Sequence, residues 1–438
     1  MTGKTQSAVK RRFGIGLVAL ALVATACSSG DAETQSNSDP AADAEPAELS
    51  ITPEEGGEEI APNTPVRVTA EHGTISDVQI DQTVVSEAAV PDGGEAEGED
   101  DEAELYEMTG TLNEDGTEWI SDWNLRPGSE IVVTATAENE AGEETEATSE
   151  FSTLEAVAGQ RLELASNFPS SGDTVGVGMP VVINFDMPVS NKGQVENSMN
   201  VVAEQEIAGA WNWVTDQMAV FRPEEYWEPH QNVTVDLNLS GVEASEGVYG
   251  VRDYQIDFEI GRELIATMHV PDHEMKIEID GEHERTIDVS NGAANRRFDT
   301  TTTGVHVLME RYDTITMDSS TVGIPEDSPG SYRVDVNYAV RTSNSGEFVH
   351  EMSSNGAIGS ANTSNGCTNL RMDDAVWFYE NTLMGDILDT TGTDREFEWD
   401  NGWGYWQKSW DEWLEGSETD EAQMTTDGTP GSVHGEDL

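Results

Sequence analysis

One cysteine of this chain stands in a segment suited to nucleophilic chemistry. Cys367 lies within ANTSNGCTNL (361–370), between a glycine and a threonine. A cysteine attacks as its thiolate, so it needs a base or a cation nearby. His350 lies 17 residues upstream, on the expected strand GEFVH, and a Gly/Ser/Asn-rich loop separates the two. A strand returning through such a loop places imidazole and thiol side by side, and Gly366 lets backbone approach closely. The helix expected from Arg371 adds its dipole.

The only other cysteine, Cys27, belongs to the leader of the chain. Lys4, Lys10, Arg11 and Arg12 precede the apolar run FGIGLVALALV, which is short for a membrane span. The following ATAC resembles a bacterial lipobox, whose cysteine becomes lipidated; the alternative is an ordinary signal peptide cut near Ala26. If Cys27 carries lipid, Cys367 has no disulfide partner. It is then a buried small hydrophobe or a reactive thiol.

The charge balance restricts the partners. With 21 basic and 86 acidic residues, the formal charge is −65, which argues against nucleic-acid binding because phosphates are repelled. Hydrophobic residues nevertheless make up 36%, and eleven tryptophans need a core. We interpret the acidic residues as a solvated surface in preference to an acidic binding patch. Trp211, Trp213 and Trp227 are expected in a core or at a sandwich edge, in preference to a sugar platform.

The composition and hydrophobic pattern divide the chain into short alternating strands, polar linkers and one clear helix. Alternation such as EIVVTATAEN and turn signals such as Asn113 to Gly116 predict small β-sandwiches, with an acidic loop inserted around 92–104. RMDDAVWFYENTL (371–383) predicts a helix. The predicted parts are a signal peptide (1–26), a disordered tether (27–46), two immunoglobulin-like domains (47–155 and 156–262), a catalytic domain (263–392), a tryptophan-rich packing arm laid back on the domain (393–416) and a disordered acidic tail (417–438).

The C-terminal half resembles a known family. The run MDSSTVGIPEDSPGSYRVDV, then GEFVHEM, then NTSNGCTNLRMDDAVWFYENTLMGDILD, is similar to the catalytic domain of L,D-transpeptidases, with the YkuD-type fold. The likeness covers about 263–415, and the lipobox with two immunoglobulin-like domains matches the mycobacterial lipoprotein branch. The family signature is a histidine, a gap, Ser/Thr-His-Gly-Cys, one residue, and Asn. The expected fold is mainly β, with a short helix after the cysteine and a C-terminal tryptophan-rich arm.

This resemblance implies a role for each matching residue. Cys367 would be the acyl-accepting nucleophile and His350 its base, oriented by the backbone of Glu351. The N–H groups of Gly366 and Cys367, with the Tyr332 hydroxyl, would form the oxyanion hole. Substrate-binding positions would be the lid residues Met317 and Tyr332 and, around the cysteine, Ser364, Asn365 and Asn369. Without the resemblance, Tyr332 and Met317 could equally be core residues.

Two departures from the family pattern bear on activity. Asn365 replaces the motif histidine, and the tryptophan usual after the catalytic histidine is missing from HEMSSNG. An asparagine can hydrogen-bond but cannot accept a proton or carry charge. If the motif histidine is only structural, activity survives; if its charge holds the thiolate, the pKa of Cys367 rises and the thiol reacts slowly.

The function implied is that of a peptidoglycan L,D-transpeptidase cross-linking the third residues of peptide stems through a cysteine thioester. Alternatives are an L,D-carboxypeptidase and a catalytically weakened, wall-binding lipoprotein. The expected location is the extracytoplasmic face of the membrane, within the cell wall and anchored through lipid on Cys27. No metal or organic cofactor is expected, since H-E-x-x-H, C-x-x-C pairs and phosphate loops are missing from the sequence. Carbapenems are expected inhibitors.

Overall fold

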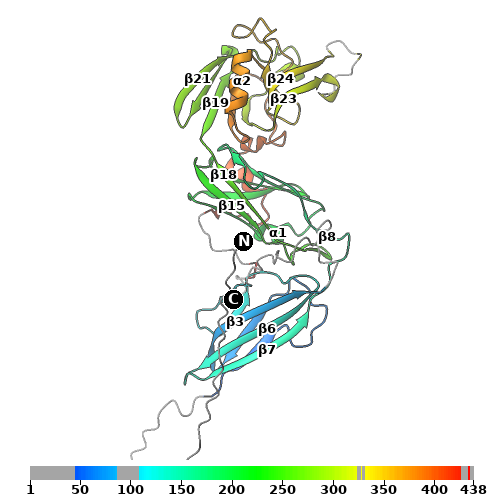
Figure 1. The fold of residues 1–438 in the computed structure, drawn as a ribbon, viewed down its shortest axis with the longest axis vertical. Coiled ribbons are helices and arrows are strands. Elements are labelled where there is room, and N and C mark those ends of the chain that lie inside the picture. Colours follow the sequence, from blue (N-terminus) through cyan, green and yellow to red (C-terminus); the bar gives the residue numbers. More distant parts are fainter. Residues whose placement is uncertain (1–44, 86–107, 323–326, 328–330, 426–432, 435–438) are drawn as a thin grey trace, which may run out of the picture. The chain divides into compact units, whose positions relative to one another are not determined.

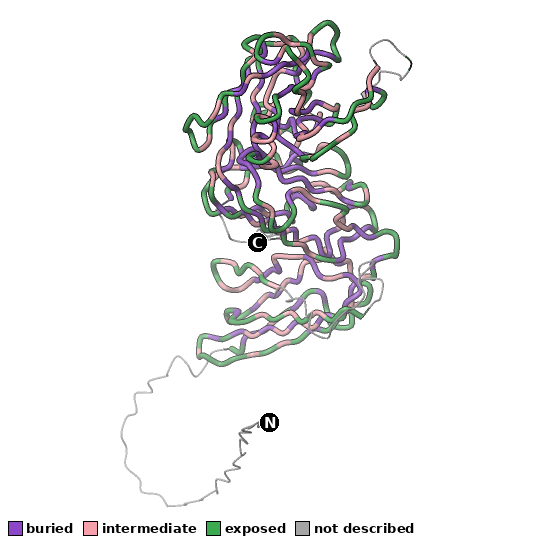
Figure 2. Tube along the Cα trace, turned by 45° about the horizontal axis from the view of Figure 1, so that its top comes forward, coloured by how far each residue is buried: buried purple, intermediate pink, exposed green. Residues whose placement is uncertain are grey.

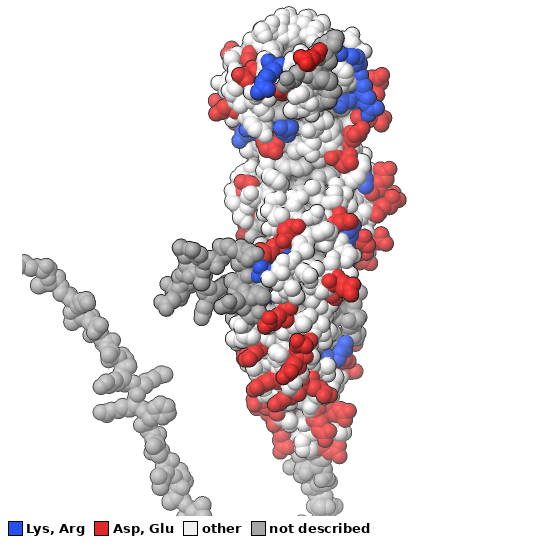
Figure 3. All heavy atoms as spheres, turned by 90° about the vertical axis from the view of Figure 1, so that its right-hand side faces the viewer, with Lys and Arg blue, Asp and Glu red and all other residues white. Residues whose placement is uncertain are grey.

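The computed structural model describes residues 45–85, 108–322, 327, 331–425 and 433–434. The predicted signal peptide, Cys27, nearly all of the tether and the acidic loop at 92–104 lie outside the described residues. Within the described ranges no helix is long and apolar enough to cross a membrane. Acidic side chains far outnumber basic ones on the face that Figure 3 shows, which agrees with the interpretation of a solvated acidic surface.

A first sandwich encloses one core between two antiparallel sheets (Figure 1). Along β6, buried and less buried residues alternate, so Ile131, Val133, Ala135 and Ala137 all point into this core. The expected turn is present, with the amide of Gly116 donating to the carbonyl of Asn113 at 3.0 Å. One sheet has the order β1 (Glu48–Thr52), β2 (Arg67–Glu71), β5 (Glu118–Ser121), β4 (Gly110–Leu112), and the other β3 (Gly73–Val84), β6 (Ser129–Asn139), β7 (Glu144–Ser152).

A second sandwich has a larger core. Trp211 and Trp227 are buried in it, as expected, and Trp213 is half-buried against it. One sheet has the order β10 (Thr174–Val175), β18 (Tyr254–Ile260), β15 (Gln231–Leu237), β12 (Met199–Ala203). The other has the order β28 (Gln423–Met424), β13 (Ala208–Thr215), β14 (Met218–Pro223), β11 (Val181–Phe185), β9 (Leu164–Phe168). A small third sheet has the order β16 (Glu243–Ser245), β17 (Val248–Gly250), β8 (Arg161–Leu162). The short helix α1 comprises Lys192–Asn197.

The C-terminal β unit contains two further sheets and a helix. The first has the order β21 (Glu282–Asp288), β20 (Glu274–Ile279), β19 (Leu264–His269), β27 (Ile387–Thr391), β22 (Gly304–Val307). The second has the order β23 (Arg311–Asp318), β24 (Arg333–Arg341), β25 (Phe348–Glu351), β26 (Thr368–Leu370). Short 3-10 turns lie at Val270–Asp272, Arg297–Asp299, Ser319–Val322 and Gly404–Gln407.

Local sequence explains two of these elements. The β20–β21 hairpin turns at Asp280 and Gly281, both with positive φ, and an Asp-Gly pair favours such a turn. Helix α2 (Met372–Asn381) follows β26, starts with two acidic residues that suit its N-terminal dipole, and packs Ala375 and Phe378 on the core. Figure 2 shows the resulting mixture of buried and exposed positions along the trace.

The tryptophan-rich arm packs against the second sandwich. Trp413 of α3 (Trp410–Leu414) is fully buried and donates its indole N–H to the Ala210 carbonyl at 3.0 Å. The buried guanidinium of Arg222 lies over the rings of Trp406 and Trp413, at 4.7 and 4.9 Å. The arm was expected to lie back on the catalytic domain; its aromatics are indeed withdrawn from water, but most of them pack on the second sandwich.

The prediction of a disordered tail from Ser417 is wrong for residues 417–425. Gln423–Met424 form β28 beside Ala208–Gly209 of β13, and Glu196 accepts hydrogen bonds from Ser417 and Thr419. Long-range pairing orders a segment whose polar composition gives no local signal.

Candidate active site

The strand that carries His350 and the strand that follows Cys367 are neighbours. β25 and β26 pair in parallel, with His350 opposite Asn369. Cys367 precedes Asn369 by two residues, so the alternation of an extended chain puts it on the same face as Asn369 and His350. The sequence predicted this pairing from a strand returning through a polar loop.

Hydrogen bonds from two side chains hold the cysteine loop. The Ser364 hydroxyl donates to the Cys367 carbonyl at 2.5 Å and accepts from the Gly366 amide at 3.2 Å. The Thr301 hydroxyl donates to the Gly366 carbonyl at 2.6 Å. Gly366 has a φ of 120°, which an L side chain rarely adopts, so this position requires glycine. The amide predicted for the oxyanion hole therefore already has a partner, Ser364, which a substrate oxygen would replace.

His350 is buried and has a fixed tautomer. Its Nδ1–H donates to the Glu351 carbonyl at 2.8 Å, the contact expected at that residue. Nε2 then carries the lone pair and accepts from the Asn369 side-chain amide at 3.1 Å, while Asn355 donates to the Asn369 oxygen at 3.0 Å. Burial lowers the pKa of His350, so the imidazole is neutral at rest.

The Cys367 thiol is protonated at rest. Burial raises the pKa of Cys367 to about 12; a backbone hydrogen bond from Phe348 lowers the pKa, and the negative charge of Glu347 raises it further. The thiol faces the Gly346 carbonyl, with Sγ and O 3.7 Å apart. No hydrogen bond joins His350 to Cys367 among the described residues. The strand β26 separates Cys367 from α2, so the expected dipole contribution from the helix is not supported.

Tyr332 and Met317 flank the cysteine. Met317 packs in a small apolar cluster with Phe348 and Cys367. Tyr332 exchanges hydrogen bonds with Ser319, and its pKa is raised by burial, by Cys367 and by Asp318. Both predicted residues therefore lie near the thiol. Their role as a lid stays a prediction, because 323–326 and 328–330 lie outside the described residues.

Asn365 contributes nothing to the loop's internal bonding. Its side chain is exposed and makes no hydrogen bond to any described residue. Ser364, Gly366 and Thr301 hold the loop around it. The replacement of the motif histidine therefore leaves the loop's scaffold intact.

Sequence reasoning missed Thr301, Asn355, Glu347 and Arg395. Thr301 and Gly366 are 65 residues apart, and such contacts have no local pattern. Asn355 lies in the Ser-Ser-Asn-Gly turn, and only its hydrogen bond to Asn369 in the structure identifies it as part of the site. Glu347 directly precedes β25, and its sequence neighbourhood offered no signal that it would be buried.

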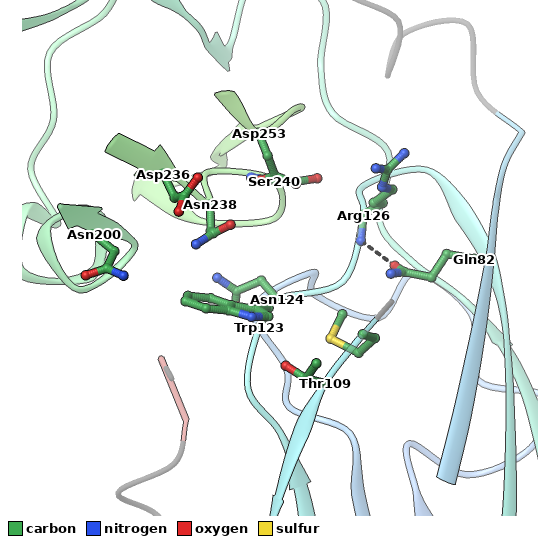
Figure 4. A pocket seen from close by; sticks show the side chains of 11 residues that line it. Gln82, Thr109, Trp123, Asn124, Arg126, Asn200, Asp236, Asn238, Ser240 and Asp253 are labelled. Carbon is green, nitrogen blue, oxygen red and sulfur yellow. Dashed lines mark hydrogen bonds between the residues drawn. The ribbon is translucent and has the colours of Figure 1, made fainter. Parts of the chain in front are cut away.

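A separate cavity of about 130 Å³ contains none of these residues in its lining. Figure 4 shows Trp123, Asn200 and Asp236 around it, and the Arg126 amide donating to the Gln82 oxygen at 2.9 Å.

The chain is similar to known proteins over nearly its whole length. Residues 57–243 match a family model described as a bacterial Ig domain, and 265–390 match one described as an L,D-transpeptidase catalytic domain. L,D-transpeptidase 2 of Mycobacterium tuberculosis (strain CDC 1551 / Oshkosh) is 31% identical over 408 residues, which is 92% of this chain and 93% of the relative. L,D-transpeptidase 1 of Mycobacterium tuberculosis (strain ATCC 25618 / H37Rv) is 34% identical over 52% of this chain and 85% of the relative. A solved structure of the LD transpeptidase LdtMt1 in complex with imipenem has 33% identity and a TM-score of 0.46, covering 52% of this chain and 98% of that chain.

Proposed function

Because this chain belongs to the L,D-transpeptidase family, we propose that it links the third residues of two peptidoglycan peptide stems through a thioester on Cys367. The observation that carries the proposal is the pairing of β25 with β26, which puts a tautomer-fixed imidazole on the face of the thiol. The family membership supports the class of reaction, and this geometry supports the choice of His350 and Cys367 as the residues that perform it.

Acylation begins with a neutral thiol and a neutral imidazole. Nε2 of His350 accepts the Cys367 proton as sulfur attacks the carbonyl carbon of the third residue of a tetrapeptide stem. The imidazolium then donates that proton to the nitrogen of the leaving D-alanine, and the thioester remains. The Glu351 carbonyl keeps Nδ1 protonated throughout, so Nε2 performs both transfers.

Asn369 prepares Nε2 for this role. It donates to the lone pair of Nε2, which keeps that nitrogen unprotonated before substrate arrives. When Nε2 receives a proton the Asn369 amide can no longer donate to it, so the Asn369 side chain must turn or shift. Asn355, bonded to the other end of the Asn369 amide, limits how far that movement goes.

Deacylation transfers the acyl group to an amine. The side-chain amine of the diamino acid on a neighbouring stem attacks the thioester carbon and loses a proton to Nε2. The C–S bond then breaks, and Nε2 returns the proton to sulfur, which releases Cys367 as a thiol. The tetrahedral oxyanion of each step would lie against the N–H groups of Gly366 and Cys367 and the Tyr332 hydroxyl. Ser364, which now accepts from Gly366, would give up that amide.

The substrate sets the location. Peptidoglycan stems lie outside the cytoplasmic membrane, so the enzyme would work there, tethered by lipid on Cys27. Met317, Tyr332, Ser364, Asn365 and Asn369 would contact the donor stem.

Intact-protein mass spectrometry after incubation with a carbapenem tests the proposal. The chain would carry Cys27→Ala, so that Cys367 is its sole thiol, and Cys367→Ala would be the control. We expect one adduct per chain, absent from the control. A folded protein that forms no adduct over a range of salt and pH would contradict a working nucleophile.

A weakened enzyme that binds the wall is the second candidate, because burial disfavours the Cys367 thiolate and Asn369 occupies Nε2 of His350. Chromatography of products from purified disaccharide-tetrapeptide separates the possibilities. Cross-linked dimer indicates transpeptidation, released D-alanine without dimer indicates carboxypeptidase activity, and binding without turnover indicates the weakened form.

A further inference from the structure

The cavity drawn in Figure 4 lies where residues of the first sandwich meet residues of the second, within the compact unit that begins at Glu45. Its two walls are in direct contact. Gly241 (φ 78°) lies so close to the first sandwich that a Cβ on it would stand 2.1 Å from the carbonyl oxygen of Leu125. Ligand sites occur preferentially at such junctions, where apolar or aromatic surface is combined with a few polar groups.

The second sandwich supplies a row of polar side chains to this cavity. Because Leu237 and Leu239 are buried in the core, the alternating residues Asp236 and Asn238 line the cavity instead. Asn200 of β12 lies opposite Asp236 in the sheet and extends the row. Strand alternation and register therefore place three polar side chains on one wall.

The first sandwich supplies an aromatic ring and a cation. Trp123 and Arg126 belong to the segment between β5 and β6, and both line the cavity. Trp123 is half-buried, and Figure 4 shows its ring across the cavity from Asp236. An indole offers a flat apolar face and a single N–H donor.

The fold does not use up the hydrogen-bonding groups of these two walls. The side chains of Asn200 and Asn238 make no hydrogen bond to any described residue, and neither does the indole N–H of Trp123. The hydroxyl of Ser240, at the edge of the same wall, is buried without a partner in the described part of the chain. Unsatisfied buried hydroxyls are uncommon in native structures, so this wall keeps hydrogen-bonding capacity that the fold leaves open.

An uncharged sugar ring fits this set of groups. Asparagine amides both donate and accept, as sugar hydroxyls do, and the face of an indole suits the C–H face of a pyranose. Asp236 disfavours an anionic ligand and Arg126 disfavours a cationic one, so an uncharged ligand fits best. The volume of about 130 Å³ corresponds to roughly ten waters at ~10–15 Å³ each, which is the size of one ring.

We propose that this cavity, which we name the sandwich pocket (lined by Trp123, Arg126, Asn200, Asp236 and Asn238), binds one ring of an uncharged sugar. Trp123 stacks on the ring, and the two asparagines bond to its hydroxyls. The proposal does not rest on the proposed function, because the sandwich pocket contains none of the residues around Cys367. The glycan strand of peptidoglycan and another polysaccharide of the wall would both present such a ring.

Ligand-observed NMR titration tests the sandwich pocket, since it detects weak binding of small sugars. The chain with Cys27→Ala is titrated with N-acetylglucosamine, with glucose and with the diamine cadaverine. We expect saturable binding of at least one sugar and none of the diamine. Trp123→Ala should weaken sugar binding about tenfold or more by removing the stacking face. Asn238→Ala should weaken it about five- to tenfold by removing hydrogen bonds to the ligand.

Matched variants separate loss of the sandwich pocket from loss of the fold. Trp123→Phe keeps an aromatic face and should stay within about threefold of the parent. Trp377→Ala changes another half-buried tryptophan, on α2, and should bind sugar like the parent. Circular dichroism identifies any variant that has unfolded. Sugar binding should persist in Cys367→Ala, and the carbapenem adduct should persist in Trp123→Ala, so failure of either proposal is visible separately.

Two polymers distinguish the sources of the ring. Peptide-free glycan strands of peptidoglycan and a dextran are compared by co-sedimentation with the protein, and a preference for either one identifies the source. Absence of saturable binding to every sugar, or equal binding by the parent and Trp123→Ala, would overturn the proposal. Tighter binding of cadaverine than of the sugars would also overturn it, because the carboxylate of Asp236 would then define an amine site.

Discussion

The cysteine loop and the tryptophan-rich arm are held by different forces. Ser364, Thr301 and Asn369 fix the loop and its histidine through hydrogen bonds between polar groups. The arm is fixed by burial of Trp413 and by rings around Arg222. Loss of a loop contact should therefore alter chemistry more than stability, and loss of an arm contact should do the reverse.

The extreme case on the loop side is Cys367→Ala. Acylation by a carbapenem should disappear completely, because no other thiol follows the leader. The thermal midpoint should change little, since the cysteine is only partly buried. Mass spectrometry and calorimetry on the same sample measure both. A residual adduct would show that another residue is acylated.

The extreme case on the arm side is Trp413→Ala. We expect a loss of about 3–5 kcal/mol in the free energy of unfolding, because removing a fully buried tryptophan leaves a cavity and deletes its hydrogen bond to the Ala210 carbonyl. The acylation rate per folded molecule should stay near that of the parent. Urea unfolding measures the first quantity. Trp399→Ala, at a half-buried site in the same arm, should lose less.

Asn369→Ala tests a residue whose loss should affect both the chemistry and the stability. It removes the donor to Nε2 of His350 and the acceptor of the Asn355 side-chain N–H, so we expect about tenfold slower acylation, and ~1–3 kcal/mol of stability lost. Asn365→Ala, an exposed asparagine of the same loop, is the matched control. Stopped-flow acylation that proceeds at the parent rate would remove Asn369 from the mechanism.

The pH dependence separates assisted from unassisted attack. His350 has a lowered pKa, so its base form persists below its ordinary value of 6.5 and is lost only as pH falls through that lowered pKa. Acylation should be nearly flat above pH 6.5, stay so down to that lowered pKa, and fall several-fold only below the lowered pKa. Alkylation, which needs free thiolate, should rise about tenfold per unit because the pKa of Cys367 is raised. Parallel profiles would argue against base assistance by His350.

Asn365→His should have the smallest effect, within about twofold, because the side chain is exposed and unbonded within the described residues. A large gain in acylation by Asn365→His would instead support the second candidate function, a weakened enzyme. Asn365→Gln keeps the amide and controls for side-chain size.

Local patterns predicted the local elements. The strand carrying His350, the hairpin at Asp280 and the helix after the cysteine follow from alternation, turn residues and helical spacing. The resemblance placed Tyr332 and Met317 near the thiol, as the structure does. The contacts of Thr300, Thr301 and Thr302 could not be predicted, because their partners lie 45 to 95 residues away and any polar residue satisfies the local sequence. β28 was missed because two residues show no alternation.

The return of the chain end to β13 has a consequence for the order of assembly. Trp403, Tyr405 and Trp413 belong to the core of the second sandwich, and β28 completes one of its sheets. A chain that is made from its N-terminus can close the first sandwich early, but the second must wait for residues 403–424. The edge of β13 is exposed during that interval and is open to pairing with another chain. A chain truncated before β28 would leave the edge of β13 permanently exposed to pairing with another chain.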